Sequence, residues 1–435
     1  MTHRSVWTLL EHQSGGQPLL PRLQTLAVLN LDPHFVQPLV LLLTPSLHTL
    51  SLSFGDPACS TEWEVAPTAT RPSGRISAFA DVLLRITNAS QLPLLSGLCI
   101  GDGGLPKDFP SSYFATLPQL SGLKTLDLLY SGAVIDLATL QLISNIPSLR
   151  SLSLEISLNG IGFRGTLQPG GGELQELHLS GSIDDLSHCF GAATLPNVVS
   201  LAVSVASVPN VGTLQDAFDL ICSQVSRSVY EVNLFVKPHI PSPSVSLADI
   251  LRPYLSFGDM NTMTVQFDEY VPLMDDQDAL AFATAWPLLT HFSYSSYYAD
   301  TPESLPTQMT VAGLLVFAQR CPELHIFDVP LLDVRVLPPP LSIPAVGQTA
   351  LRYMQIPEYL GGDTANLLYL AVILDRLFPY YCACATPRSV TMQDNVVPFV
   401  LDCEHRYRPV RITDLLVKGM QAQRRLLEDD GTISE

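Results

Sequence analysis

The chain has 435 residues, of which 47% are hydrophobic and 15% are charged. This composition supplies ample apolar surface for a large core and excludes an intrinsically disordered chain. Lys and Arg number 23 against 41 Asp and Glu, a formal net charge of -18. A field of that sign repels phosphate backbones and anionic lipids, so nucleic acids and membrane surfaces are not expected partners.

The first residues, 1–18, carry neither the apolar run nor the cleavage pattern of a secretory signal, and we expect them to form a lead-in or cap. Two apolar stretches, 35–54 and 366–385, are interrupted by prolines or charges and are expected in the core rather than in a membrane. The eight cysteines are expected as reduced thiols. A cytoplasmic or nuclear protein, or one found in both compartments, fits these features.

From residue 19 to about residue 400 one short phrase returns: leucine, two variable residues, an apolar residue, one variable residue and another apolar residue. The clearest copies are PRLQTLAV from Pro21, PSLHTLSL from Pro45, PSLRSLSL from Pro147, PNVVSLAV from Pro196, PLLTHFSY from Pro287 and PELHIFDV from Pro322. The first apolar positions are Leu23, Leu47, Leu95, Leu123, Leu149, Leu174, Val198, Val229, Met260, Leu289, Leu324 and Leu351. Their spacing of 24 to 35 residues is typical of leucine-rich repeats, and the single interval of 48 predicts a degenerate unit near residues 70–75.

The phrase predicts a strand, because apolar residues two apart share one face of a strand and the residues between them point to the other face. Helical patterns lie between copies at 137–146, 214–225, 278–286, 311–321 and 364–378. We therefore expect an α/β fold, an irregular leucine-rich-repeat solenoid over residues 19–400, with parallel strands on its concave face and helices on its convex face. A doubly wound α/β enzyme would also alternate strand and helix, but it would not repeat one phrase twelve times.

Three inserts rich in proline and serine, at 58–73, 237–246 and 331–344, are expected as surface loops. Residues 401–435 differ from the rest of the chain because basic residues gather there. Apolar positions within 412–427 predict an amphipathic helix that caps the last repeat, followed by an acidic tail. The alternative is a basic docking helix for an acidic partner.

No phosphate loop, nucleophile elbow or paired-histidine zinc motif is present, so we expect no catalysis and no cofactor. One group of soft ligands, Cys382, Cys384, Cys403 and His405, would suit zinc if two extended segments met. Its spacing is not that of a standard zinc module, and ordinary buried cysteines with a capping strand explain the same residues. A zinc-stabilised or enzymatic domain in the last quarter of the chain remains a third reading.

The variable strand positions predict where a protein target would bind, because they line the concave face of the array. Candidate contacts there are Asp127, Glu155, Glu176, His178, Glu231, Asn233, His291 and Asp328. We expect an extended basic or hydroxyl-rich segment, with Asp127, Glu155, Glu176 and Glu231 as the charge contacts. The alternative is that these residues are merely the small or polar ones that a crowded parallel sheet tolerates.

Several longer phrases together resemble the repeat region of fungal, basidiomycete-type F-box proteins. They are PLLPRLQTLAV, LLTPSLHTLSLSF, DDQDALAFATAWPLLTHFSY, TVAGLLVFAQRCPELHIFDVP and YLAVILDRLFP, which span residues 19–379. The resemblance implies a target-recognition subunit of an SCF-type ubiquitin ligase, in which an F-box binds the Skp adaptor and the repeats capture the target. No stretch here resembles the F-box helices, so Skp binding is expected only if an F-box lies upstream. The second reading is a repeat scaffold unrelated to ubiquitin.

Overall fold

The computed structural model describes most of the chain between residues 17 and 379. The described stretches are 17–28, 41–53, 82–87, 92–101, 109–158, 169–237, 245–268, 272–296, 308–339, 342–344, 350–361 and 364–379, with a few short pieces that include Val417 and Met420. The chain divides into two compact units, Met1–Val229 with Leu234–Pro238, and Tyr230–Asn233 with His239–Glu435. We call them unit 1 and unit 2 and describe each by itself.

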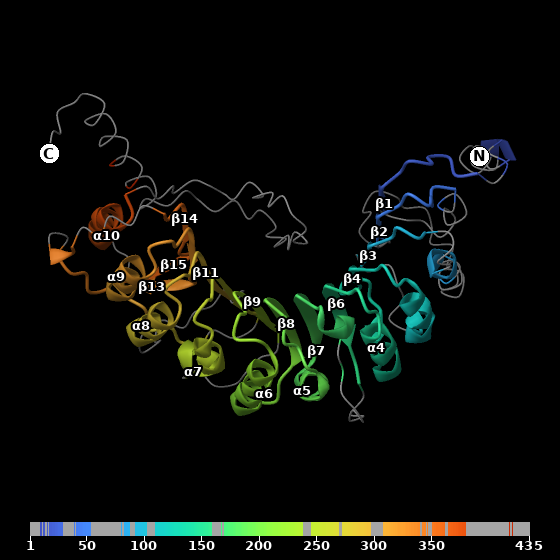
Figure 1. The fold of residues 1–435 in the computed structure, drawn as a ribbon. Helices are drawn as coiled ribbons and strands as arrows, with labels where there is room; N and C mark the ends of the chain where they lie inside the picture. Colours follow the sequence, from blue (N-terminus) through green and yellow to red (C-terminus); the bar gives the residue numbers. More distant parts are fainter. Residues whose placement is uncertain are drawn as a thin grey trace, which may run out of the picture. The chain divides into compact units, whose positions relative to one another are not determined.

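Unit 1 contains a parallel sheet whose neighbouring strands follow chain order. Its strands are β1 (Thr25–Val28), β2 (Thr49–Ser53), β3 (Gly97–Gly101), β4 (Thr125–Asp127), β5 (Val134–Ile135), β6 (Ser151–Ile156), β7 (Glu176–Ser182) and β8 (Ser200–Ser207), with β5 paired to β6 beyond the end of β4. The helices are the 3-10 helices η2 (Ser111–Gln119) and η3 (Pro169–Gly172) and the α-helices α4 (Leu137–Ser144), α5 (Ile183–Ala192) and α6 (Val211–Gln224). Helices α4, α5 and α6 lie along one face of the sheet (Figure 1).

Unit 2 repeats this arrangement with its own strands and helices. Its main strands are β10 (Thr262–Phe267), β11 (His291–Ser296), β12 (Ile326–Asp328) and β14 (Tyr353–Gln355), all parallel, and a second sheet pairs β13 (Leu331–Asp333) with β15 (Glu358–Leu360). Strand β9 (Glu231–Val236) is divided, with its first three residues in unit 2 and its last three in unit 1. The helices are α7 (Leu247–Leu251), η4 (Arg252–Ser256), α8 (Asp276–Ala285), α9 (Val311–Arg320) and α10 (Thr364–Leu377).

The repeated phrase builds the core in both units. Eleven of its twelve first apolar positions are at most 2% exposed, and Leu23 is half-buried. The second apolar position forms an in-register row across the sheet of unit 1: Leu26, Leu50, Leu98, Leu126, Leu152, Leu177 and Leu201. Burying apolar side chains between a sheet and its helices is the main favourable contribution to such a fold. The predicted α/β leucine-rich-repeat fold class is confirmed.

Unit 2 fills its core with aromatic rings as well as leucines. The ring of Phe292 lies 5.8 Å from that of Phe282, 5.2 Å from that of Phe317 and 5.7 Å from that of Phe327, measured between centroids. Trp286 stacks on Phe282 at 5.1 Å. These rings come from α8, α9, β11 and β12, so they hold successive repeats together. No helix in the described part of the chain is long and apolar enough to cross a membrane.

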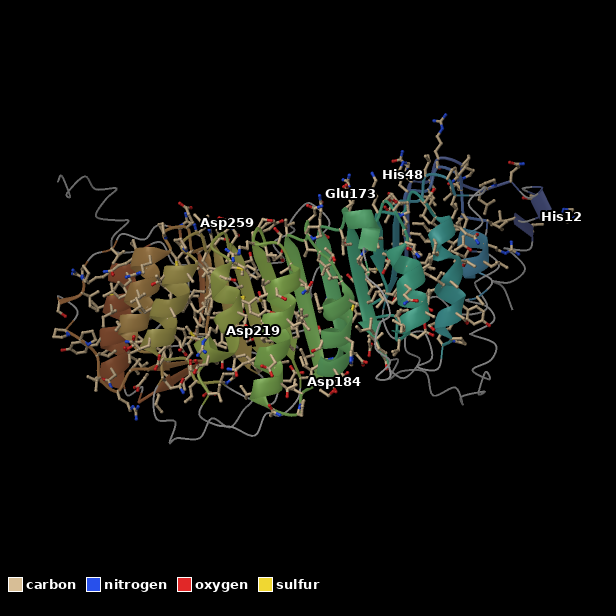
Figure 2. All side chains as sticks on the ribbon, turned by 60° about the horizontal axis from the view of Figure 1, so that its bottom comes forward. His12, His48, Glu173, Asp184, Asp219 and Asp259 are labelled. Atoms are coloured by element: carbon tan, nitrogen blue, oxygen red, sulfur yellow. The ribbon has the colours of Figure 1, made fainter. Side chains whose placement is uncertain are left out.

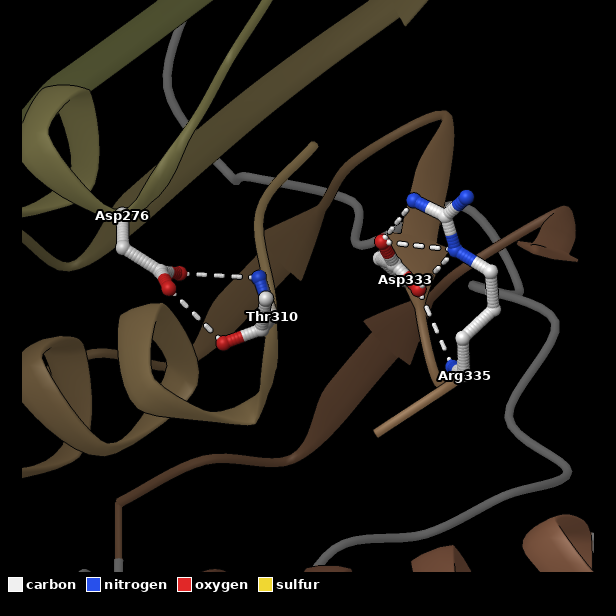
Figure 3. Close-up of polar contacts among 4 residues, drawn as sticks. All are labelled: Asp276, Thr310, Asp333 and Arg335. Carbon is white, nitrogen blue, oxygen red and sulfur yellow. Dashed lines mark hydrogen bonds and ion pairs between the residues drawn. The ribbon is translucent and has the colours of Figure 1, made fainter. Parts of the chain in front are cut away.

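Aspartates near the starts of helices bind the repeats to one another. Asp136, the N-cap of α4, accepts a hydrogen bond from the Ser111 hydroxyl at 2.6 Å, and Asp278 of α8 accepts one from the Ser246 hydroxyl at 2.6 Å. Asp276 accepts from both the amide and the hydroxyl of Thr310, at 2.8 and 2.7 Å (Figure 3). A carboxylate at a helix N-terminus accepts from otherwise unpaired amides and suits the helix dipole.

A second carboxylate in Figure 3 closes the turn that follows β13. The guanidinium of Arg335 donates to both carboxylate oxygens of Asp333, and this interaction lowers the pKa of Asp333. Gly361, which follows β15, has a φ of 74° and lies against Arg335, so that a Cβ there would come within 2.2 Å of the Arg335 Cγ. Both features fix the small second sheet.

The five predicted helices are all present, as α4, α6, α8, α9 and α10. Two other expectations are wrong. The interval of 48 residues contains no intervening strand of the sheet, because β2 pairs directly with β3, Thr49 with Gly97 and Leu52 with Ile100. The stretch 331–344 does not begin as a loop, since Leu331–Asp333 forms β13, whose apolar residues are buried. Residues 58–73 and most of 237–246 lie outside the described residues.

Candidate functional site

The strand residues between the buried leucines point to the face of the sheet that carries no helix, and we call this the helix-free face. In unit 1 the register places them in rows that cross the strands. The first row is Thr25, Thr49, Gly97, Thr125, Ser151, Glu176 and Ser200, and the second row is Ala27, Ser51, Cys99, Asp127, Ser153, His178 and Ala202. A partial third row contains Ser53, Gly101, Glu155, Ser180 and Ser204.

The helix-free face of unit 1 is small, hydroxyl-rich and free of cations. None of these row positions is lysine or arginine, and most are serine, threonine, glycine or alanine. The hydroxyls of Ser151, Ser153, Ser180 and Ser200 have no hydrogen-bond partner among the described residues. Each hydroxyl can donate one hydrogen bond and accept others, so it can bind the amide and carbonyl groups of a polypeptide.

Asp127 lies at the end of β4 and is only 5% exposed. Its Oδ1 accepts a hydrogen bond from the Leu129 amide at 3.1 Å, and the Cys99 thiol donates to Oδ2 at 3.7 Å. Burial raises the pKa of this carboxyl, and these two hydrogen bonds offset part of that rise. The carboxylate is therefore set into the face, where water solvates it poorly.

The other predicted acidic contacts in unit 1 lie at two different heights of the sheet. Glu176 is exposed in the first row, and Glu155 is half-buried in the third row. No ion pair of the described residues involves Asp127, Glu155 or Glu176, since the pairs found join Arg252 to Asp249 and Arg335 to Asp333. Within the described ranges, these three carboxylates therefore have no Lys or Arg side chain in ion-pair contact.

The two predicted histidines do not add positive charge at neutral pH. Burial lowers the pKa of His178 to about 4, and its Nε2 lies 3.2 Å from the Ser204 hydroxyl. Burial likewise lowers the pKa of His291, in unit 2, to about 4. Both imidazoles are neutral at pH 7, and that of His178 is hydrogen-bonded, which agrees with a structural role for this histidine inside its repeat strand.

The predicted contacts in unit 2 pair with neighbouring polar groups of the same unit. The Asn233 amide donates to Glu231 Oε1 at 3.1 Å, and the Ser293 hydroxyl donates to Asp328 Oδ2 at 3.4 Å. His291 pairs in register with Ile326, so an apolar side chain enters the row there. The eight predicted contacts thus form one set in unit 1, Asp127, Glu155, Glu176 and His178, and another in unit 2.

Two residues near Asp127 were missing from the sequence-based prediction. Cys99 occupies the variable position of LLSGLCI in β3 and lies beside Asp127, and the repeat register alone could have placed it there. Tyr130 is 46% exposed on the turn that follows β4. The sequence carries no signal for it, because the turn interrupts the repeat phrase.

The possible zinc ligands Cys382, Cys384, Cys403 and His405 lie outside the described residues. Within the described ranges, no group of three or more His, Cys, Asp or Glu side chains is arranged to hold a metal ion. Zinc binding by the four residues therefore stays a prediction.

No protein-family model matches the chain, and no curated protein matches it. Three solved structures show a distant likeness. The leucine-rich repeat-containing protein LegL7 from Legionella pneumophila is 14% identical over 68% of this chain and 97% of its own, with a TM-score of 0.29. The plant peptide hormone receptor RGFR1 in complex with RGF2 is 13% identical over 78% of this chain and 52% of its own, with a TM-score of 0.23. A TDR receptor is 14% identical over 73% of this chain and 65% of its own, with a TM-score of 0.18. Scores this low add nothing to the strand order and register that define the fold.

Proposed function

We propose that this protein is a protein-binding module that holds an extended polypeptide segment on its helix-free face. The observation that carries the proposal is the chemistry of that face in unit 1: rows of small side chains that include four serines, Ser151, Ser153, Ser180 and Ser200, whose hydroxyls have no hydrogen-bond partner among the described residues. Small side chains let a partner's backbone approach the sheet closely, and the hydroxyls supply donors and acceptors for its peptide groups.

A surface of this kind suits a polypeptide better than a small molecule. Small ligands are held in concave, largely apolar pockets of several hundred Å³. An apolar cavity in the core of unit 1, lined by Leu152, Leu177 and Phe190 among others, has a volume of about 10 Å³. That is barely the size of one water molecule and leaves no room for a metabolite.

The test is a selection of random peptides on the immobilised chain, followed by binding measurements on face variants. Ser153→Trp places a large ring in the middle of the second row and should abolish binding of peptides that use the face. Asp219→Trp is the matched control, because Asp219 is exposed on α6, on the helix side (Figure 2). The proposal fails if no peptide is enriched, or if the two variants weaken binding equally.

The finer assignment, target recognition for an SCF-type ubiquitin ligase, is supported by the resemblance of the repeat phrases to fungal F-box proteins. Co-purification with the Skp adaptor and cullin tests it, both for this chain and for a native product with any upstream extension. Binding only with the extension supports the ligase assignment. Binding in neither form favours the alternative, a repeat scaffold unrelated to ubiquitin.

A further inference from the structure

A proline-rich segment follows β13 in unit 2. Its sequence over residues 335–340 is RVLPPP, and it belongs to the part of the insert 331–344 that lies beyond the strand. Residues 337–339 form neither helix nor strand. The conformation of this loop is therefore set by its prolines rather than by a regular hydrogen-bond pattern.

The consecutive prolines favour the polyproline II conformation here. The pyrrolidine ring of a proline fixes its φ at about −65°. Leu337, Pro338 and Pro339 each precede a proline, and this disfavours the α-helical region for all three. The conformation that remains is an extended left-handed helix with three residues per turn and no internal hydrogen bonds.

The exposed apolar side chains of this segment fall on one edge of such a helix. Val336 is 84% exposed, the largest fraction among the large apolar side chains described, and Pro339 is exposed as well. These two residues are three positions apart and so share one edge of a helix with three residues per turn. Leu337 and Pro338, on the other edges, are half-buried. The segment thus presents an apolar edge to solvent.

Both ends of the segment are fixed to the core of unit 2. Before it, Val334 is fully buried, and its amide donates a hydrogen bond to the Leu360 carbonyl at 3.0 Å. After it, Ile343 is buried, and its carbonyl accepts a hydrogen bond from Arg376 Nη2 at 3.0 Å. The loop is therefore presented between two anchored points.

Polar contacts within the loop hold its course further. The Arg335 guanidinium donates to the Asp333 carboxylate at 2.6 Å (Figure 3). Ser342 donates to the Pro339 carbonyl, from its hydroxyl at 2.6 Å and from its amide at 2.8 Å. Among the described residues, the carbonyls at positions 337 and 338 accept no hydrogen bond, so two acceptors remain for a partner.

We propose that residues 335–340 are a binding segment for a protein domain that recognises polyproline II helices. Such domains hold their ligand in a groove lined by aromatic side chains. Val336 and Pro339 enter the groove, and the carbonyls of Leu337 and Pro338 accept hydrogen bonds from its rim. Little conformational entropy is lost on binding, because the prolines and the anchored ends fix the segment beforehand. This is a second binding surface, in unit 2, in addition to the face of unit 1 proposed above.

The test uses the full chain and a panel of purified SH3, WW and EVH1 domains, which bind proline-rich segments. Biolayer interferometry should show saturable binding of the chain to at least one of these domains. A free decapeptide of proline, which adopts the same helix, should displace the chain. Val336→Asp should weaken binding at least tenfold, because it places a charge in an apolar contact. Pro338→Ala combined with Pro339→Ala frees the backbone and should also weaken binding several-fold.

Val372→Asp is the matched control, because it makes the same substitution at an exposed position of α10 in the same unit. It should leave binding unchanged, and so should Ser153→Trp on the helix-free face. Thermal unfolding should be unchanged for Val336→Asp, since that side chain contributes little to the core. The proposal is overturned if no domain of the panel binds, if the decapeptide does not compete, or if Val336→Asp binds as the parent chain does.

Discussion

Asp276 is predicted to hold α9 in place, and its removal should cost unit 2 a measurable part of its stability. Its carboxylate accepts hydrogen bonds from the Thr310 amide at 2.8 Å, the Thr310 hydroxyl at 2.7 Å and the Gly313 amide at 2.9 Å. A net contribution of about 0.7 kcal/mol for each half-exposed bond gives about 2 kcal/mol. The favourable position of an anion at a helix N-terminus adds roughly 0.5 kcal/mol, so Asp276→Ala should lower the free energy of unfolding by about 2.5 kcal/mol.

Urea unfolding measures this loss, and hydrogen exchange localises it to residues 308–320. Asp276→Asn keeps one carbonyl oxygen for the two backbone amides and should lose only about 1 kcal/mol. Asp219→Ala, a change of an exposed residue on α6, should stay within about 0.5 kcal/mol of the parent chain. The reasoning is refuted if Asp276→Ala behaves like Asp219→Ala, or if exchange at the start of α9 is unchanged.

The same close approach predicts an unusual sign for Gly313→Ala. Alanine in place of glycine inside a helix ordinarily stabilises it by about 0.5–1 kcal/mol. At Gly313 the added Cβ would meet Met309 Cγ at 2.5 Å and Asp276 Oδ1 at 2.8 Å. Destabilisation by Gly313→Ala in the same urea experiment would support the packing described, and stabilisation would contradict it.

Three further predictions concern the core and the titrating groups. His178 has a pKa of about 4 in the folded chain, below its ordinary 6.5, so the unfolded chain binds more protons between these two pH values. The free energy of unfolding should therefore fall as the pH drops from 6.5 to 4. Urea midpoints measured over this pH range should change less for His178→Gln than for the parent chain. Phe292→Ala should cost about 4 kcal/mol in the same assay, and Phe292→Leu less than half of that, because Phe292 contacts three other rings. Burial raises the pKa of Cys189 and Cys321 to about 12, so both thiols should react slowly with iodoacetamide at neutral pH. Mass spectrometry of the native chain should find Cys99 alkylated well before these two. Equal alkylation rates for the three cysteines would contradict the burial of Cys189 and Cys321.

The repeat phrase predicts the strands well because it is a direct consequence of how a strand buries alternate side chains. Where the phrase is intact, as at Leu149 and Leu324, both the strand and its buried face lie where the sequence places them. Helix α5 was missed although Ser182 and Asp185 form a recognisable start, with the Asp185 amide bonded to the Ser182 hydroxyl at 3.1 Å. The helix contains only four strongly apolar residues, and the helical periodicity of these four in the sequence was too weak to predict it.

Features that depend on distant pairing could not be predicted from the local sequence. The interval of 48 residues predicted a degenerate repeat with its own strand, but β2 pairs directly with β3. The length of the interval could not distinguish a degenerate repeat from an insert, because both would have the same length. Strand β13 lies in a stretch that its later prolines mark as a loop, and only its partner β15 makes it a strand.

The in-register pairing of unit 1 limits how a partner that crosses the strands can be recognised. Equivalent positions of a row recur about every 4.8 Å, whereas an extended peptide presents side chains on one face about every 6.8 Å. The two spacings differ, so row positions and peptide side chains come into register only at intervals. They coincide after about three strand spacings or two peptide steps, each roughly 14 Å long. A partner anchored at Asp127 on β4 would therefore be in phase again at Ala202 on β8, three strands along the row. Ser153 and His178 lie between these two positions and would face the backbone of the partner. They would therefore recognise the course of its main chain rather than the identity of its side chains.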